Sequence, residues 1–110
     1  MKVVVIPEVR QYFFELQYLL YEKNYFSYYE DAERYVEELI EDIKKNLPAK
    51  IKRKASKHFT DRYGQRLYYA IFPKSKHTQW YAFFRIYQKD DELFYQVRHI
   101  ENNHTAAQYL

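Results

Sequence analysis

The spacing of hydrophobic residues changes along the chain, and each change marks a predicted element. The β-branched run Lys2–Ile6 ends at Pro7, which predicts a short first strand. Beyond it the apolar positions recur every three or four residues. This spacing predicts a first helix over residues 8–22.

A second helix is predicted between the tyrosine-rich segment that follows and Pro48. Its apolar positions form one stripe with helical spacing: Ala32, Tyr35, Val36, Leu39, Ile40, Ile43 and Leu47. The pattern Ser27-Tyr28-Tyr29-Glu30 matches a capping box, which places the beginning of the helix there. Acidic residues crowd the first turns and Lys44-Lys45 lies near the end, as the helix dipole favours. Proline cannot continue a helix, so this one ends before Pro48.

The second half of the chain predicts strands joined by short turns. Strand-like runs cover residues 67–72, 80–88 and 93–100, with a hairpin loop over 74–78 and a turn over 89–92. Residues 50–58 are a basic linker, which either contacts phosphate or is a solvated connector. Residues 59–65 hold the only glycine, Gly64, and are expected to form a turn. The tail over residues 104–110 is either a short helical turn or a frayed end.

The order of these elements is β-α-α-β-β-β, which is typical of a two-layer α+β domain. Two helices are expected to pack on one face of a mainly antiparallel sheet. With 110 residues, the chain is long enough to bury a core of its own, so we expect a single domain over residues 1–110.

The composition excludes several classes of protein. The chain has no Cys, which rules out a disulfide scaffold and a thiolate metal site. A single Gly is too few for the glycine-rich loops of dinucleotide-binding and P-loop folds. No apolar run approaches the ~20 residues of a membrane span, and the first residues lack the pattern of a signal peptide. We therefore expect a cytoplasmic protein that does not enter a membrane.

Charge is divided unevenly along the chain. Residues 1–43 carry a net charge of −6 and the remainder carries +9, although the whole chain is only +3. The basic part favours an anionic partner, whereas the acidic part is interpreted as a solvated helix face. Tyrosine, with 14 copies, adds rings that can pack in a core or stack on bases.

The last two strands are expected to present the functional groups. If Asp90-Asp91 is a two-residue loop, it pairs Tyr87 with Phe94, Arg85 with Gln96, Phe83 with Arg98 and Tyr81 with Ile100. Because strand side chains alternate, one face then carries Tyr81, Arg85, Tyr87, Gln96 and Arg98, while Trp80, Ala82, Phe84, Ile86, Tyr95 and Val97 face the helices. The first of these faces is expected to be open. His99 alternates onto the apolar side, as a core or edge histidine.

An open face with arginine and tyrosine near a histidine suits RNA. Arginine binds phosphate through two hydrogen bonds, tyrosine stacks on bases, and histidine transfers protons near neutral pH. RNA supplies its own 2′-OH nucleophile, so a base, an acid and a cation suffice without a metal ion or another cofactor. His104, just past the last strand, is the candidate acid–base residue. His58 and His77 lie in basic loops, and the histidines lack the spacing of metal ligands.

Several segments carry a resemblance to a known family. They are the pattern from Ala32 to Leu47-Pro48, the segment Phe84-Arg85-Ile86-Tyr87, the ending from Val97 to Leu110, and the paired segments Lys74-Ser75-Lys76 and Thr78-Gln79-Trp80-Tyr81. From the second helix onward, the chain resembles the RelE/ParE superfamily of bacterial toxins from type II toxin–antitoxin systems. The resemblance implies the fold of that superfamily.

The resemblance also implies two activities. RelE-like members cut mRNA in the ribosomal A site by 2′-OH attack without a metal ion, whereas ParE-like members poison DNA gyrase and lack that catalytic set. By position, Arg85 matches the phosphate-binding arginine of the third strand, and His104 matches the C-terminal histidine of some ribonuclease subgroups, with Tyr109 near it. An antitoxin protein that covers the active face and the helices is the implied partner.

The sequence hypothesis is therefore a ribosome-associated mRNA endonuclease that needs no cofactor. Its candidate catalytic residues are His104, Arg85, Arg98 and Tyr87, and its candidate RNA-binding residues are Lys52, Arg53, Lys54, Lys57, Lys74, Lys76, Tyr81 and Gln96. RNA, the ribosome and an antitoxin are the expected partners. A gyrase poison without catalytic activity and an inactive protein-binding module are the alternatives.

Overall fold

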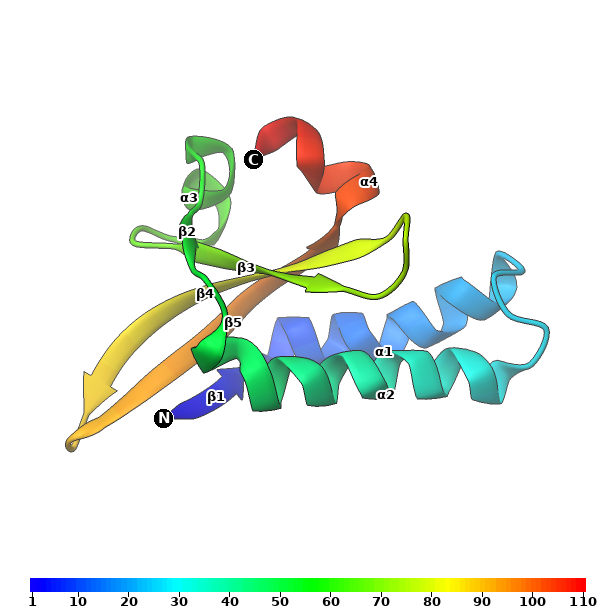
Figure 1. Ribbon diagram of the computed structural model, residues 1–110, viewed down its shortest axis with the longest axis horizontal. Coiled ribbons are helices and arrows are strands. Elements are labelled where there is room, and N and C mark those ends of the chain that lie inside the picture. The colour runs from blue at the N-terminus through cyan, green and yellow to red at the C-terminus, as the bar shows by residue number, and fades with distance from the viewer.

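The computed structural model describes residues 1–110, and one of its layers is a pair of long helices. Helix α1 spans Pro7–Glu22 and helix α2 spans Tyr29–Asn46, and the two lie side by side against the sheet (Figure 1). Their buried residues recur at helical spacing: Val9, Phe13 and Leu16 in α1, and Ala32, Val36, Leu39 and Ile43 in α2. The two predicted helices are confirmed. None of the helices combines the length and the apolar character needed to cross a membrane.

The beginning of α2 differs from the sequence prediction. The helix begins at Tyr29, and no side chain caps its first turn, so the expected capping box at Ser27 is wrong. The cap position is held by Tyr28, whose rigid ring cannot fold back onto the helix amides as a serine can. Acidic residues in the first turn and lysines in the last turn do match the helix dipole, as predicted.

Five strands form one mixed sheet. They are β1 (Lys2–Val5), β2 (Arg53–Lys54), β3 (Tyr68–Pro73), β4 (Gln79–Lys89) and β5 (Glu92–Asn102), in the spatial order β1-β5-β4-β3-β2. β1 runs parallel to β5, and the other neighbours are antiparallel. The expected α+β class and mainly antiparallel sheet are confirmed, while the short edge strand β2 forms inside the segment predicted as a linker.

The β4–β5 hairpin follows the predicted register only as far as Phe84. Asp90 and Asp91 form the expected two-residue turn, both with positive φ (52° and 64°), as such a hairpin requires. Arg85 pairs with Gln96 and Tyr87 pairs with Phe94, as predicted. Beyond the Phe84–Val97 pair, a β-bulge adds one residue to β5.

The bulge overturns the rest of the predicted register. Phe83 pairs with His99 rather than with Arg98, and Tyr81 pairs with Glu101 rather than with Ile100. Past the bulge the alternation of β5 is therefore inverted, because one extra residue moves every following side chain to the other face. His99, which was expected on the apolar side, lies on the opposite face, and Ile100 enters the core beneath the helices.

Both faces of the sheet are buried, and they hold two separate cores. The larger core, between the sheet and the α1–α2 pair, consists of Val9, Phe13, Leu16, Val36, Leu39, Ile43, Leu47, Ala70, Phe72, Trp80, Ala82, Phe84, Val97 and Ile100. The smaller one, on the other face, consists of Phe59, Leu67, Tyr81, Phe83 and Ala106. The face that the sequence predicted to be open is therefore covered over part of its length.

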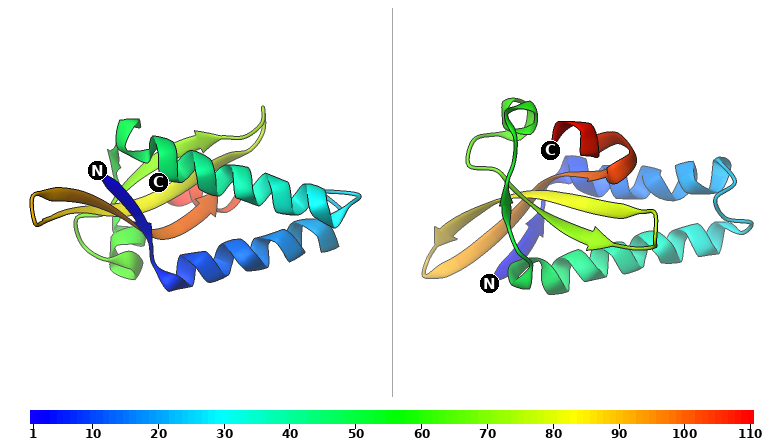
Figure 2. Two further views of the ribbon diagram at one scale, coloured as in Figure 1. Left: turned by 90° about the horizontal axis from the view of Figure 1, so that it is seen from below. Right: turned by 45° about the horizontal axis from the view of Figure 1, so that its top comes forward.

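Short helices provide that cover. Helix α3 spans Lys57–Tyr63, helix α4 spans Asn103–Ala106, and both lie across the sheet from α1 and α2 (Figure 2). The predicted turn over residues 59–65 and the basic linker up to residue 58 are thus wrong where α3 forms. A helix of seven residues shows too little periodicity to be detected, and its only fully buried anchor is Phe59. The tail forms a helical turn, which was one of the two alternatives.

Truncation of the larger core is expected to cost much of the stability. Leu39 is fully buried, so Leu39→Ala should lower the free energy of unfolding by about 2–5 kcal/mol through lost burial and a residual cavity. Urea denaturation measures the change. Glu37→Ala, on the exposed side of the same helix, is the control and should change stability by less than about 0.5 kcal/mol. Equal losses in the two variants would contradict the assigned packing.

Candidate functional site

The bulge places two consecutive side chains of β5 against the end of α3. The ring of His99 stacks on the ring of Tyr63, with 4.0 Å between the centroids and 10° between the planes. The guanidinium of Arg98 lies against Gly64, where an added Cβ would be only 3.4 Å from its Cζ atom. Gly64 also has φ of +114°, which side-chain-bearing residues rarely adopt, so the backbone conformation here requires glycine.

His99 forms a close pair with Glu101, two residues further along β5. Its Nε2 atom lies 2.7 Å from Oε1 of Glu101, and the two side chains are 21% and 23% exposed. An ionised carboxylate can only accept a hydrogen bond, so Nε2 carries the proton and donates it. Nδ1 is then the unprotonated nitrogen. It has no hydrogen-bond partner within the protein, and because no fully buried side-chain nitrogen or oxygen is unpartnered, Nδ1 keeps access to solvent.

Aromatic packing sets the protonation state of His99. Besides Tyr63, the rings of Phe83 and Phe59 lie 5.5 and 6.3 Å from it. Burial lowers the pKa of His99 below its usual value of 6.5, and this effect outweighs the hydrogen bond and the charge of Glu101, which act to raise it. At neutral pH His99 is therefore uncharged, and its Nδ1 atom can accept a proton.

Two tyrosines flank Glu101 from opposite layers. Burial raises the pKa of Tyr63 in α3 and of Tyr12 in α1, and the charge of Glu101 raises both further. Both hydroxyls thus stay protonated at neutral pH and can act as donors. Because β1 pairs with β5 only up to Val97, no strand covers the edge of β5 beside His99 and Glu101. Both side chains of the pair remain partly exposed, at 21% for His99 and 23% for Glu101.

Arg85 joins this site from β4. It lies two positions from Phe83, the partner of His99, which is about 7 Å along the strand on the same face. Gln96 faces Arg85 across the hairpin, as predicted. Tyr87 lies two pairs further out, stacked on Phe94 at 5.3 Å and 38% exposed. Arg85, Arg98 and Gln96 are thus brought together, with Tyr87 at the margin.

His104 is not part of this group. Asn102 pairs with Trp80, five positions and about 17 Å along β4 from Arg85. The side chain of Asn102 accepts a hydrogen bond from the backbone N–H of His104, which holds His104 in the first turn of α4. His104 and Arg85, both candidate catalytic residues, are therefore not brought together, because the last strand runs to Asn102 rather than to Ile100 and carries His104 away.

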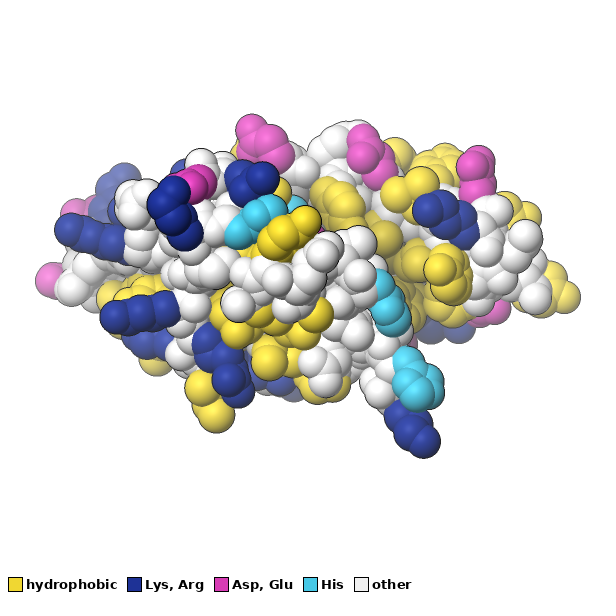
Figure 3. All heavy atoms as spheres, turned by 90° about the horizontal axis from the view of Figure 1, so that it is seen from above, with side chains coloured by type: hydrophobic (Ala, Val, Ile, Leu, Met, Phe, Trp, Pro, Cys, Tyr) yellow, Lys and Arg dark blue, Asp and Glu magenta, His cyan; other side chains and the backbone are white.

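The candidate RNA-binding residues form two separate groups. Arg53 and Lys54 lie on the exposed edge strand β2, with the Lys52 ammonium 5.0 Å from the ring of Tyr68. Lys76 lies in the β3–β4 loop, at the other end of the six-residue strand β3, which is about 20 Å long. Lys57, in α3, is exposed but paired with Asp61 at 2.8 Å. In the view from above, basic side chains gather toward the end of the molecule that holds the β4–β5 hairpin (Figure 3).

Two members of that set are not accessible. Tyr81 is only 5% exposed and packs in the smaller core, so its expected place on an open surface is wrong. Lys74 has a side chain that is 15% exposed, paired with Glu38 at 3.6 Å and placed over the ring of Tyr35. The smaller core covers Tyr81, and Glu38 of α2 pairs with Lys74.

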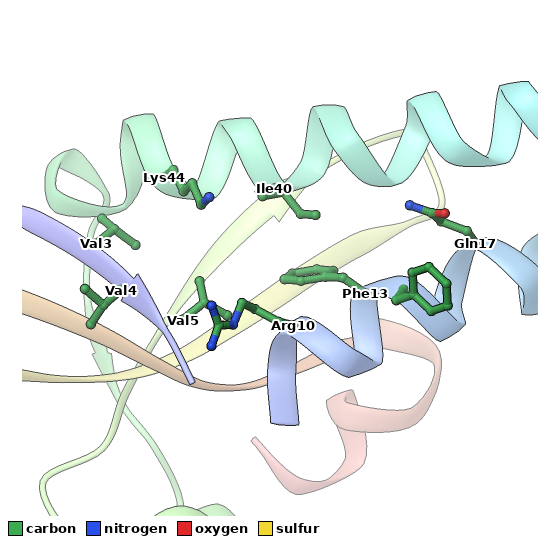
Figure 4. Close-up of a pocket in the computed structure, with 9 residues that line it drawn as sticks. Val3, Val4, Val5, Arg10, Phe13, Gln17, Ile40 and Lys44 are labelled. Atoms are coloured by element: carbon green, nitrogen blue, oxygen red, sulfur yellow. The ribbon is translucent and has the colours of Figure 1, made fainter. Parts of the chain in front are cut away.

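A groove between β1, α1 and α2 lies away from the His99–Glu101 pair. Apolar residues of β1 line it together with Phe13 and Ile40, and Arg10, Gln17 and Lys44 are its polar residues (Figure 4). It contains neither a carboxylate nor a histidine. It therefore lacks the groups needed for acid–base chemistry.

The His99–Glu101 pair and Tyr63 were missed by sequence reasoning. A signal did exist, because His99 and Glu101 are two positions apart and side chains with that spacing share one face of a strand. No group of three or more His, Cys, Asp or Glu side chains is placed to hold a metal ion. No protein-family model, curated protein or solved structure matches the chain.

The lowered pKa of His99 predicts a specific pH dependence of stability. Because the folded pKa lies below the unfolded value of about 6.5, the unfolded chain binds the proton first. Stability should fall as the pH drops from 7.5 to 5.5, by at most about 1.4 kcal/mol per pH unit for this one proton. Urea denaturation across this range should show a shallower slope for His99→Gln. The His77→Gln control should keep the original slope, and an unchanged slope in His99→Gln would refute the assignment.

Proposed function

We propose that the protein is a metal-independent endoribonuclease that cleaves mRNA, and that it acts as the toxin of a toxin–antitoxin pair. One observation carries the chemical part: an uncharged histidine, oriented by a carboxylate, lies beside an arginine where no strand pairs with β5. A base, an orienting group and a cation are the parts that RNA cleavage through the 2′-OH requires. The resemblance to RelE-like toxins supplies the substrate class and the partner.

The proposed reaction begins with proton transfer to His99. Nδ1 accepts the proton of the ribose 2′-OH, and the 2′-oxygen attacks the adjacent phosphorus atom. The bond from phosphorus to the 5′-oxygen breaks, which leaves a 2′,3′-cyclic phosphate on one fragment and a 5′-hydroxyl on the other. Arg98, together with Arg85, stabilises the added charge on the phosphate oxygens. Tyr63, protonated at neutral pH, is the donor for the departing 5′-oxygen.

Glu101 has an orienting role in this scheme. It holds His99 in the tautomer with a free Nδ1 atom and stabilises the imidazolium that forms. The basic residues of the β2 edge, Lys52, Arg53 and Lys54, suit contact with the RNA backbone. A gyrase poison would need no acid–base pair, so the pair favours the nuclease over that alternative. Ribosome-bound mRNA as the substrate places the proposed activity in the cytoplasm.

Substitutions at His99 and Arg98 should slow cleavage strongly while the protein stays folded. His99→Gln removes the proton acceptor and should slow cleavage of ribosome-bound mRNA by about 10²–10⁴-fold. Arg98→Ala should also slow it strongly, because phosphate charge is left uncompensated. Primer extension on mRNA from translation reactions measures the cuts.

His77→Gln is the matched control, since His77 lies exposed in the β3–β4 loop away from the pair, and it should cleave normally. Full cleavage by folded His99→Gln would refute the proposed base. Inhibition of gyrase supercoiling with intact mRNA would instead support the ParE-like alternative.

A further inference from the structure

A second concave site lies at the far end of the helix pair, next to the β5–α4 junction. Its walls come from α1, the α1–α2 connection, the β3–β4 loop and the end of β5. Seen from above, a hydrophobic recess lies toward the end of the molecule that holds the α1–α2 connection, with histidine and basic side chains at its margin (Figure 3). Neither the fold nor the proposed chemistry requires such a recess.

The back wall of this recess is aromatic and rigid. Trp80 is 2% exposed, and its Nε1–H donates a hydrogen bond of 2.9 Å to the hydroxyl of Tyr35. The ring of Tyr35 is held between Phe26, at 5.5 Å, and the ammonium of Lys74, at 4.8 Å. At the mouth, Tyr25 is 70% exposed and leaves its ring free for stacking. A flat apolar ring between these walls would be sandwiched by aromatic surfaces.

The ionisable side chains that line the recess are basic only, apart from its tyrosines. Lys23 and His104 line it, and no aspartate or glutamate does. The side chains of Lys23 and His104 form no ion pair or hydrogen bond within the protein. Asn102 also lines the recess, and because its Oδ1 accepts the N–H of His104, its amide N–H₂ group is left to donate. Cationic and donor groups beside aromatic walls fit an aromatic anion.

Tyr12 connects the recess to the His99–Glu101 pair. It lines the recess, and it lies close enough to Glu101 for that charge to raise its pKa. Trp80 is also only three positions, about 10 Å, along β4 from Phe83, the strand partner of His99. The recess and the pair therefore lie close together along β4 and β5.

We propose that this recess binds one nucleotide, with the base between Tyr25 and the Trp80 wall and the phosphate at Lys23 and His104. The proposal rests on the proposed function only for the source of the nucleotide, which would be a unit of the RNA chain bound beside the cleavage site. His104 then has a binding role rather than a role in proton transfer. A free mononucleotide shares the same chemistry, and the experiment separates the two sources.

Trp80, the only tryptophan, reports binding directly through its fluorescence. AMP, titrated to about 10 mM, should quench it with saturation, and a 2′-deoxy oligonucleotide, which cannot be cut, should quench it at lower concentration. Lys23→Ala and Tyr25→Ala should each weaken binding about tenfold, since one removes a charge contact and the other a stacking ring. Both residues are exposed, so both variants should fold. Lys44→Ala, in the groove between β1 and α1, is the control and should bind normally.

Each outcome decides the proposal. Saturable quenching by both the oligonucleotide and AMP, lost in both variants, supports a site that binds one nucleotide of an RNA chain. Quenching by AMP alone supports a site for the free nucleotide. Absence of quenching by either, or equal quenching by inorganic phosphate, overturns it. Because binding is measured without cleavage, the site stands if His99→Gln still cleaves mRNA, and the nuclease stands if AMP fails to bind.

Discussion

The single extra residue of β5 decides which side chains reach the surface beneath α3 and which enter the main core. Val97 and Ile100 are both buried against the helices although they are three positions apart, which a regularly alternating strand cannot achieve. Without the bulge, His99 and Glu101 would take the place of Ile100 beneath the helices. Burying that polar pair in an apolar core would cost several kcal/mol, roughly, so core packing itself enforces the bulge.

The smaller core surrounds the histidine that the bulge places on this face of the sheet. Phe59 stacks on Phe83 at 4.3 Å and fixes α3 on the sheet, which in turn places Tyr63 against His99. Partial desolvation by these rings keeps the histidine uncharged, while Glu101 fixes its tautomer. Aromatic packing and the hydrogen bond to Glu101 together therefore determine the charge and the tautomer of His99. If α3 were loosely packed on the sheet, His99 would be exposed to solvent. The guanidinium of Arg98 would also lose its contact with Gly64.

Much of the fold could be predicted because it depends on local patterns. The helical stripe of α2 and the Asp90-Asp91 turn are each determined by residues close together in the sequence. Both were predicted with nearly correct bounds. The parallel β1–β5 pair joins the two ends of the chain, and no local pattern reports it. The bulge has a faint signal in the spacing of Val97 and Ile100. Missing it misplaced His99, and His104 became the candidate acid–base residue. His104 follows Asn102, whose strand partner Trp80 lies about 17 Å along β4 from Arg85.

The tautomer and pKa of His99 test the account most directly. In ¹⁵N-labelled protein, the ring nitrogens of the four histidines can be followed by NMR through a pH titration, and His99→Gln assigns the signal. The account predicts that His99 is protonated at Nε2 near neutral pH and that its pKa lies below the usual value of about 6.5. A proton at Nδ1, or a pKa at or above the usual value, would contradict the placement of His99 by the bulge and the chemistry built on it.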